Sequence, residues 1–141
     1  DWSSDVCSSD LPDLRRSTAE ARRALPPSYP KADAIFNVTR AALLVAALVS
    51  GDHDALKVAL QDRIHQPYRL PLMKGAAEVL DAAKEAGALG AVVSGAGPTL
   101  LALCDGGTDA VAEAMQSTWA NLGVKAEAKV VGLSNAGARS T

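Results

Sequence analysis

The loop at residues 94–99 constrains the fold of this chain most, because it lies between two short apolar runs. The runs cover residues 89–93 and 100–104, and apolar runs this short that are bounded by Gly, Asp or Pro predict buried strands. Both glycines of the loop permit positive φ and a close approach to the main chain, while its proline stiffens the exit. The loop is therefore either an ordinary tight connection or a contact for a small polar or anionic group. Its sequence is Ser94-Gly95-Ala96-Gly97-Pro98-Thr99.

Composition restricts the class of protein. The chain has 141 residues, of which 48% are hydrophobic and 21% charged, and these values are typical of a soluble globular domain. The formal net charge of −2 gives no reason to expect a nucleic acid or a membrane as partner. The longest apolar run, residues 41–49, is about half as long as a bilayer requires. We expect a cytoplasmic protein in which Cys104 is a small buried hydrophobic residue.

The two ends of the chain differ from its middle. Residues 1–10 contain four serines and three aspartates and have neither a helical nor a strand period. We predict that they are a non-native or disordered leader and exclude them from the domain. The domain is predicted to cover residues 11–133, followed by a small, polar, disordered tail at residues 134–141.

Capping signals predict the helices. Ser17 and Glu20 form a capping box, and the helix that they open must end before Pro26. A long helix is predicted over residues 31–50, closed by Gly51. Its apolar residues recur at three- and four-residue steps and predict one buried stripe. The stripe consists of Ile35, Val38, Ala42, Val45 and Val49. Further helices are predicted over residues 54–63, 73–86 and 108–122, with an irregular connection around Pro67 and Pro71.

The order of elements indicates the fold class. Helices come first, then two strands, a helix, and a last strand at residues 124–133 in which apolar and charged residues alternate. This order predicts an α+β domain with helices packed on one side of a mostly antiparallel sheet. Three strands are few for such a sheet. A fourth strand would precede Leu11, where the leader stands, so we expect the first strand to be missing.

Four segments together resemble a known family. Their order and spacing are similar to those in the C-terminal half of the homoserine kinases, which belong to the GHMP kinase superfamily, and the resemblance covers residues 11–133. It implies a GHMP kinase C-terminal domain with a ferredoxin-like sheet. The glycine loop resembles the third motif of the superfamily, whereas the Thr-x-x-x-Arg segment from Thr18 to Arg22 and the His-Gln-Pro-Tyr-Arg segment from His65 to Arg69 point to homoserine kinases. The segments are residues 17–22, 37–40, 62–69 and 94–99.

The resemblance implies ATP-dependent phosphorylation of the L-homoserine hydroxyl, giving O-phospho-L-homoserine on the route to threonine. In the family the ATP triphosphate lies in a Pro-x-x-x-Gly-Leu-Gly-Ser-Ser loop, and this sequence has no such segment. The acidic residues that would hold Mg²⁺ belong to the same N-terminal half. We therefore expect ATP and Mg²⁺ to bind the full-length parent, and this chain alone to hold neither and to be inactive. Apolar surface left uncovered would favour a homodimer.

The family's substrate-binding residues match three positions here. Arg22 and Arg69 match arginines that bind the substrate carboxylate, and Thr18 matches a substrate-side hydroxyl. A guanidinium suits this task because its planar fork donates two parallel hydrogen bonds to a carboxylate. The loop at residues 94–99 is then close to the transferring phosphoryl group. The resemblance assigns no catalytic residue and no metal ligand to this chain.

Other readings remain open. Without the resemblance, Arg22 is an exposed helix residue and Arg69 a surface arginine that braces a loop. Asn37 and Arg40 either lie near the site or tie the long helix to its neighbours. The whole domain could instead be a non-catalytic amino-acid-binding module with a ferredoxin-like sheet, or part of a GHMP kinase that acts on another small molecule.

Overall fold

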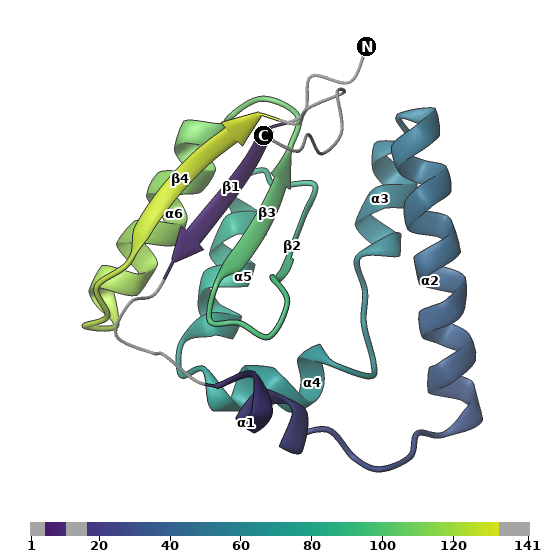
Figure 1. Cartoon of the computed structure of the whole chain (residues 1–141). Helices are drawn as coiled ribbons and strands as arrows, with labels where there is room; N and C mark the ends of the chain where they lie inside the picture. Colours follow the sequence, from purple (N-terminus) through teal and green to yellow (C-terminus); the bar gives the residue numbers. More distant parts are fainter. Residues whose placement is uncertain (1–4, 11–16, 133–141) are drawn as a thin grey trace, which may run out of the picture.

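The computed structural model describes residues 5–10 and 17–132, which form an α+β fold (Figure 1). The described strands are β1 (Asp5–Asp10), β2 (Gly90–Val93), β3 (Leu100–Cys104) and β4 (Glu127–Gly132). The described helices are α1 (Thr18–Arg23), α2 (Lys31–Ser50), α3 (His53–Ala59), α4 (Gln66–Arg69), α5 (Ala76–Glu85) and α6 (Thr108–Asn121), and a 3-10 turn, η2 (Leu70–Leu72), follows α4. The predicted α+β class is therefore confirmed.

The strands form one sheet in the order β2-β3-β1-β4, and every neighbouring pair is antiparallel. Strand β1 lies in the middle, where Cys7 is opposite Ala102 on one side and Val130 on the other. We expected residues 1–10 to stay outside the fold and the first strand to be missing. The structure corrects both expectations for residues 5–10, which supply that strand. Strands pair through main-chain N–H and C=O groups, so a Ser- and Asp-rich segment can join a sheet without any apolar period.

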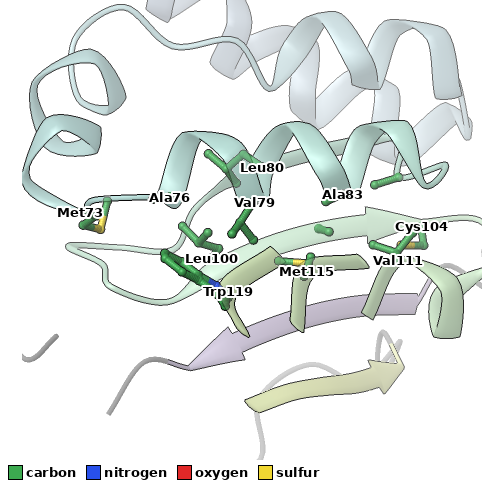
Figure 2. Close-up of a cluster of buried hydrophobic side chains, with 12 residues drawn as sticks. Met73, Ala76, Val79, Leu80, Ala83, Leu100, Cys104, Val111, Met115 and Trp119 are labelled. Carbon is green, nitrogen blue, oxygen red and sulfur yellow. The ribbon is translucent and has the colours of Figure 1, made fainter. Parts of the chain in front are cut away.

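Helices α5 and α6 lie side by side on one face of the sheet and enclose the main core (Figure 2). Strand β3 contributes Leu100, Ala102 and Cys104 to this core, all completely buried, and the prediction for Cys104 is confirmed. The intervening Leu101 and Leu103 belong to a second cluster with Leu56 of α3. Because successive side chains of a strand point to opposite faces, α5 and α6 cover one face and α3 covers part of the other.

Helix α2 has the predicted bounds, and it ends at Gly51, whose φ of 69° is left-handed. Its predicted buried stripe is wrong: Val38 is 70% exposed and Val49 84% exposed, whereas Ala47 is buried against α3. The three- and four-residue spacing places these apolar residues on one face of the helix, but spacing does not show whether another element covers that face. By length and hydropathy α2 is also long and apolar enough to cross a membrane, although core helices and signal sequences pass the same test.

The segment between α3 and α5 is more regular than we expected. Helix α3 ends at Ala59, earlier than predicted, and the connection predicted to be irregular contains α4 and η2. Pro67 lies in the first turn of α4. A proline is tolerated there because the first N–H groups of a helix have no partner within it. This short helix brings the His65–Arg69 region against the glycine loop. The predicted tail, residues 134–141, lies outside the described residues.

Candidate functional site

The glycine loop is closed by its own main chain. The Ser94 N–H donates to the Thr99 carbonyl at 2.9 Å, and the Gly97 N–H donates to the Ser94 carbonyl at 3.0 Å. Gly95 and Gly97 both have positive φ, at 59° and 73°. A Cβ at Gly97 would lie 2.6 Å from the Met73 Sδ, so this position also needs glycine for packing. The loop is thus a rigid corner between β2 and β3.

Arg69, the last residue of α4, contacts this corner directly. Its Nη1 donates a hydrogen bond of 2.7 Å to the Gly95 carbonyl. Its Nε is buried and has no hydrogen-bond partner among the described residues. A guanidinium has five N–H donors, and among the described residues only the Gly95 carbonyl is recorded as a partner of Arg69.

Helix α1 approaches the same place. Its capping box is formed as predicted: the Ser17 Oγ accepts from the Glu20 N–H, and the Glu20 carboxylate accepts from the Ser17 N–H. Ala21 of this helix is buried, and it lines a small cavity together with Arg69 and residues 96–98 of the loop. Thr18 and Arg22 are both exposed and are three and one residues from Ala21. Residues three or four positions apart share a helix face, so Thr18 lies beside both Ala21 and Arg22 and borders the face that meets the loop. Arg22 directly follows Ala21 and lies about 100° around the helix from it.

A larger cavity of about 330 Å³ lies on the other side of Arg69, between α2, the α3–α4 connection and β2. Arg40, His65 and Arg69 all line it. The Arg40 guanidinium lies over the Phe36 ring at 4.2 Å, a cation–π contact, and its Nε is buried without a partner in the described part of the chain. The cavity is therefore bordered by two guanidinium groups with unused donors.

Asp62 is the acidic group of this cavity, and its side chain is only 14% exposed. Four N–H donors face it: the Asn37 side-chain amide and the main-chain N–H groups of residues 64, 65 and 66. Burial by itself would raise the pKa of Asp62. The four hydrogen bonds, of which the Gln66 N–H contributes most, outweigh burial and lower the pKa below its usual value.

The structure brings several of the predicted residues together, and Asn37, Arg40, Arg69 and Gly95 line one cavity. Arg69, the loop and α1 are brought together, and Asn37 ties α2 to the α3–α4 connection because it also accepts from the Arg63 N–H at 2.9 Å. The roles of Thr18 and Arg22 stay predictions. Sequence reasoning missed Asp62 and Gln66. An aspartate a few residues before a proline-containing turn is a capping signal that could have identified Asp62.

The described residues do not suit Mg²⁺–ATP on their own. Among them, no group of three or more His, Cys, Asp or Glu side chains could hold a metal ion. Two main-chain N–H groups of the glycine loop are used within the loop, and Pro98 has none, so few remain for a phosphate.

Known proteins resemble this chain in sequence and in fold. The chain is 50% identical over 131 residues to the homoserine kinase of Microchaete diplosiphon and 50% identical over 129 residues to that of Trichormus variabilis. These matches cover 92% and 91% of this chain and 43% of each relative, so the chain spans less than half the length of the curated relatives that it matches.

The crystal structure of the homoserine kinase from Cytophaga hutchinsonii superposes with a TM-score of 0.86 at 27% identity, covering 92% of this chain and 42% of that chain. The family model described as GHMP kinases C terminal matches residues 44–121, more than half of the chain. That model covers α3 to α6 and the glycine loop with its Arg69 contact. The chain therefore belongs to the GHMP kinases and has the fold of their C-terminal domain.

Proposed function

We propose that this chain forms the substrate-binding wall of a homoserine kinase, which transfers a phosphoryl group from ATP to the hydroxyl of L-homoserine. The observation that carries the proposal is the hydrogen bond from Arg69 to the Gly95 carbonyl. It holds a guanidinium with unused donors at the corner of the glycine loop. The similarity to homoserine kinases at 50% identity supports the choice of substrate.

In this proposal the substrate carboxylate binds the free donors of Arg69 and the guanidinium of Arg22. Charge-assisted hydrogen bonds of this kind are the strong ones, and a planar fork also fixes the orientation of the carboxylate. Thr18 lies on the same face of α1 as Arg22 and contacts the substrate through its hydroxyl group. The main chain of the loop forms a rigid wall near the reacting hydroxyl. Phosphoryl transfer depends mainly on positioning and on neutralising charge, so such a wall contributes to the rate.

ATP and Mg²⁺ are the cofactors that this proposal requires of the whole enzyme, and their ligands lie outside the described residues. The substrate is a small amino acid, and we expect a cytoplasmic enzyme with neither a nucleic acid nor a membrane as partner. A homodimer remains our expectation, because α2 has an exposed apolar face that includes Val38 and Val49.

The test is a chimera in which this chain replaces the aligned region of the Microchaete diplosiphon kinase. We expect homoserine phosphorylation by the chimera. Arg69→Ala and Arg22→Ala should each raise KM for homoserine by roughly 10- to 100-fold, because each removes a charged partner of the carboxylate. Arg23→Ala is the matched control, since Arg23 is also exposed on α1 but lies about 100° around the helix from Arg22.

Two results would contradict the proposal. One is an unchanged KM for homoserine in both arginine variants. The other is tight binding of homoserine to this chain alone without ATP, together with an inactive chimera, which would favour a non-catalytic amino-acid-binding module. Turnover by the chain alone would contradict the expectation that it is inactive.

A further inference from the structure

The Asp62 carboxylate accepts four hydrogen bonds from other groups of the chain. Its Oδ1 accepts from the Asn37 amide and from the Ile64 N–H at 3.1 Å, and its Oδ2 accepts from the His65 N–H at 2.9 Å and from the Gln66 N–H. The N–H groups of the cap residue His65 and of Gln66 are among those that the start of α4 would otherwise leave unpaired. His65, the cap residue itself, makes no side-chain capping bond. Asp62 therefore caps α4 from a position four residues before its first residue, Gln66.

Helix α4 depends on such tethers because it has only four residues. A single helical turn is not stable by itself in water, so contacts outside the helix must fix its position. Two of them lead to the proposed site. The Gln66 Oε1 accepts from the Val93 N–H at 2.9 Å, and Arg69 donates to the Gly95 carbonyl. The start and the end of α4 are thus tied to the two sides of Ser94.

Asn37 extends this connection to the long helix. Its side chain donates to Asp62 and accepts from the Arg63 N–H, so both of its polar atoms are used on the α3–α4 connection. The residues joined in this way are 25 and 26 positions apart. A chain of hydrogen bonds therefore runs from α2 through Asp62 and Gln66 to β2, and α4 lies along it.

We propose that Asp62 is a positioning residue: together with Asn37 and Gln66 it fixes α4 so that the Arg69 guanidinium lies against Gly95 in the geometry that binds the substrate carboxylate. This inference rests on the proposed function of Arg69. Asp62 itself does not touch substrate. Removing its charge rotates or loosens α4 and displaces Arg69, and a displacement of about 1 Å in such a group is enough to weaken a reaction strongly.

The experiment compares Asp62→Asn with Asp52→Asn in the chimeric kinase. Asn is close to Asp in shape, but it loses the charge and half of the acceptor capacity. Asp52 is the matched control because it caps a different helix, α3, accepting from the Ala55 N–H at 2.9 Å, and no hydrogen bond to α4 is recorded for it among the described residues. We expect Asp62→Asn to raise KM for homoserine roughly tenfold or more and to leave KM for ATP within about twofold. Asp52→Asn should change neither.

A double-mutant cycle with Arg69→Ala separates positioning from a merely structural role. If Asp62 acts through Arg69, Asp62→Asn will not raise KM for homoserine further when Arg69 is already alanine. An equal increase in both backgrounds would overturn the proposal, as would an unchanged KM in the Asp62→Asn single variant. If Arg69→Ala itself has no effect, the proposed function of Arg69 fails instead, so the two failures are distinguishable.

Gln66 gives a second route if the Asp62 variant does not fold. Gln66→Ala removes the acceptor of the Val93 N–H, whereas Gln66→Glu keeps an acceptor oxygen at the same position. We expect the alanine variant to raise KM for homoserine and the glutamate variant to restore most of the loss. Equal KM values for the wild type and Gln66→Ala would overturn the proposal.

Discussion

Gly95 and Gly97 share a left-handed backbone conformation but differ in packing, so alanine at the two positions should lower the unfolding free energy by different amounts. Both have positive φ, and a Cβ at Gly95 would meet nothing within 4 Å. Gly95→Ala should therefore cost only the left-handed conformation, about 1–2 kcal/mol of unfolding free energy. A Cβ at Gly97 would lie 2.6 Å from the Met73 Sδ and 3.3 Å from the Val93 Cγ1.

Gly97→Ala should lower the unfolding free energy through the left-handed conformation and, in addition, through overpacking of the core. Met73 is flexible but only 4% exposed, and it packs in the main core, so it has little room to move away. Overpacking a core typically costs about 1–3 kcal/mol. The expected total for Gly97→Ala is therefore about 2–5 kcal/mol.

The assay is urea unfolding of this chain, followed by far-ultraviolet circular dichroism and by the fluorescence of the buried Trp119. The control is Gly97→Ala in a Met73→Ala background, where the cost should fall toward that of Gly95→Ala because the clashing sulfur is absent. Equal losses of stability in the two single variants would refute the packing argument, and so would an unchanged cost of Gly97→Ala after Met73 is removed.

Three further outcomes are expected in the same assay. Ser17→Ala removes the capping box of α1 and should cost about 1 kcal/mol; no loss would mean that α1 does not contribute to the folded state. The pKa of Asp62 is lowered in the folded chain, so its ionised carboxylate stabilises the fold at pH values above the usual carboxyl pKa. This contribution is lost as the pH falls through the pKa of the folded state. The difference in unfolding free energy between the wild type and Asp62→Asn should therefore shrink between pH 7 and pH 3. Val49→Lys should change stability by less than about 0.5 kcal/mol and Leu56→Ala by about 2–5 kcal/mol, since the first side chain is 84% exposed and the second completely buried.

Local signals predicted the helices well. The bounds of α2 and the capping box of α1 were correct because caps, prolines and glycines act on neighbouring residues. The two strands of the hairpin were also predicted, from short apolar runs. The order of elements indicated a strand just before Leu11, but the sequence did not indicate that residues 5–10 supply it, nor the outward direction of the α2 stripe. Both depend on which distant segment lies alongside, and side-chain periodicity does not contain that information.

The site was predictable only in part. The loop containing Gly95 was chosen from its glycines between two apolar runs and Arg69 by resemblance, and the hydrogen bond that joins them spans 26 positions in the chain. The network around Asp62 is made of contacts 25 to 27 positions apart, together with a local cap. Propensity and spacing describe neighbours within a few turns, so long-range polar contacts of this kind require coordinates.

The place of β1 in the sheet has a consequence for how the chain folds. The hairpin of β2 and β3 forms from residues close together, whereas β1 must reach β3 and β4 across roughly 90 to 125 intervening residues, as the paired positions Ser9–Leu100 and Val6–Val131 indicate. Contacts over such separations form late and slow the overall folding rate. Since β1 is the only described strand that touches β4, completing the sheet waits for the two ends of the chain to meet. Pulse-labelling hydrogen exchange should therefore find β3 protected before β4.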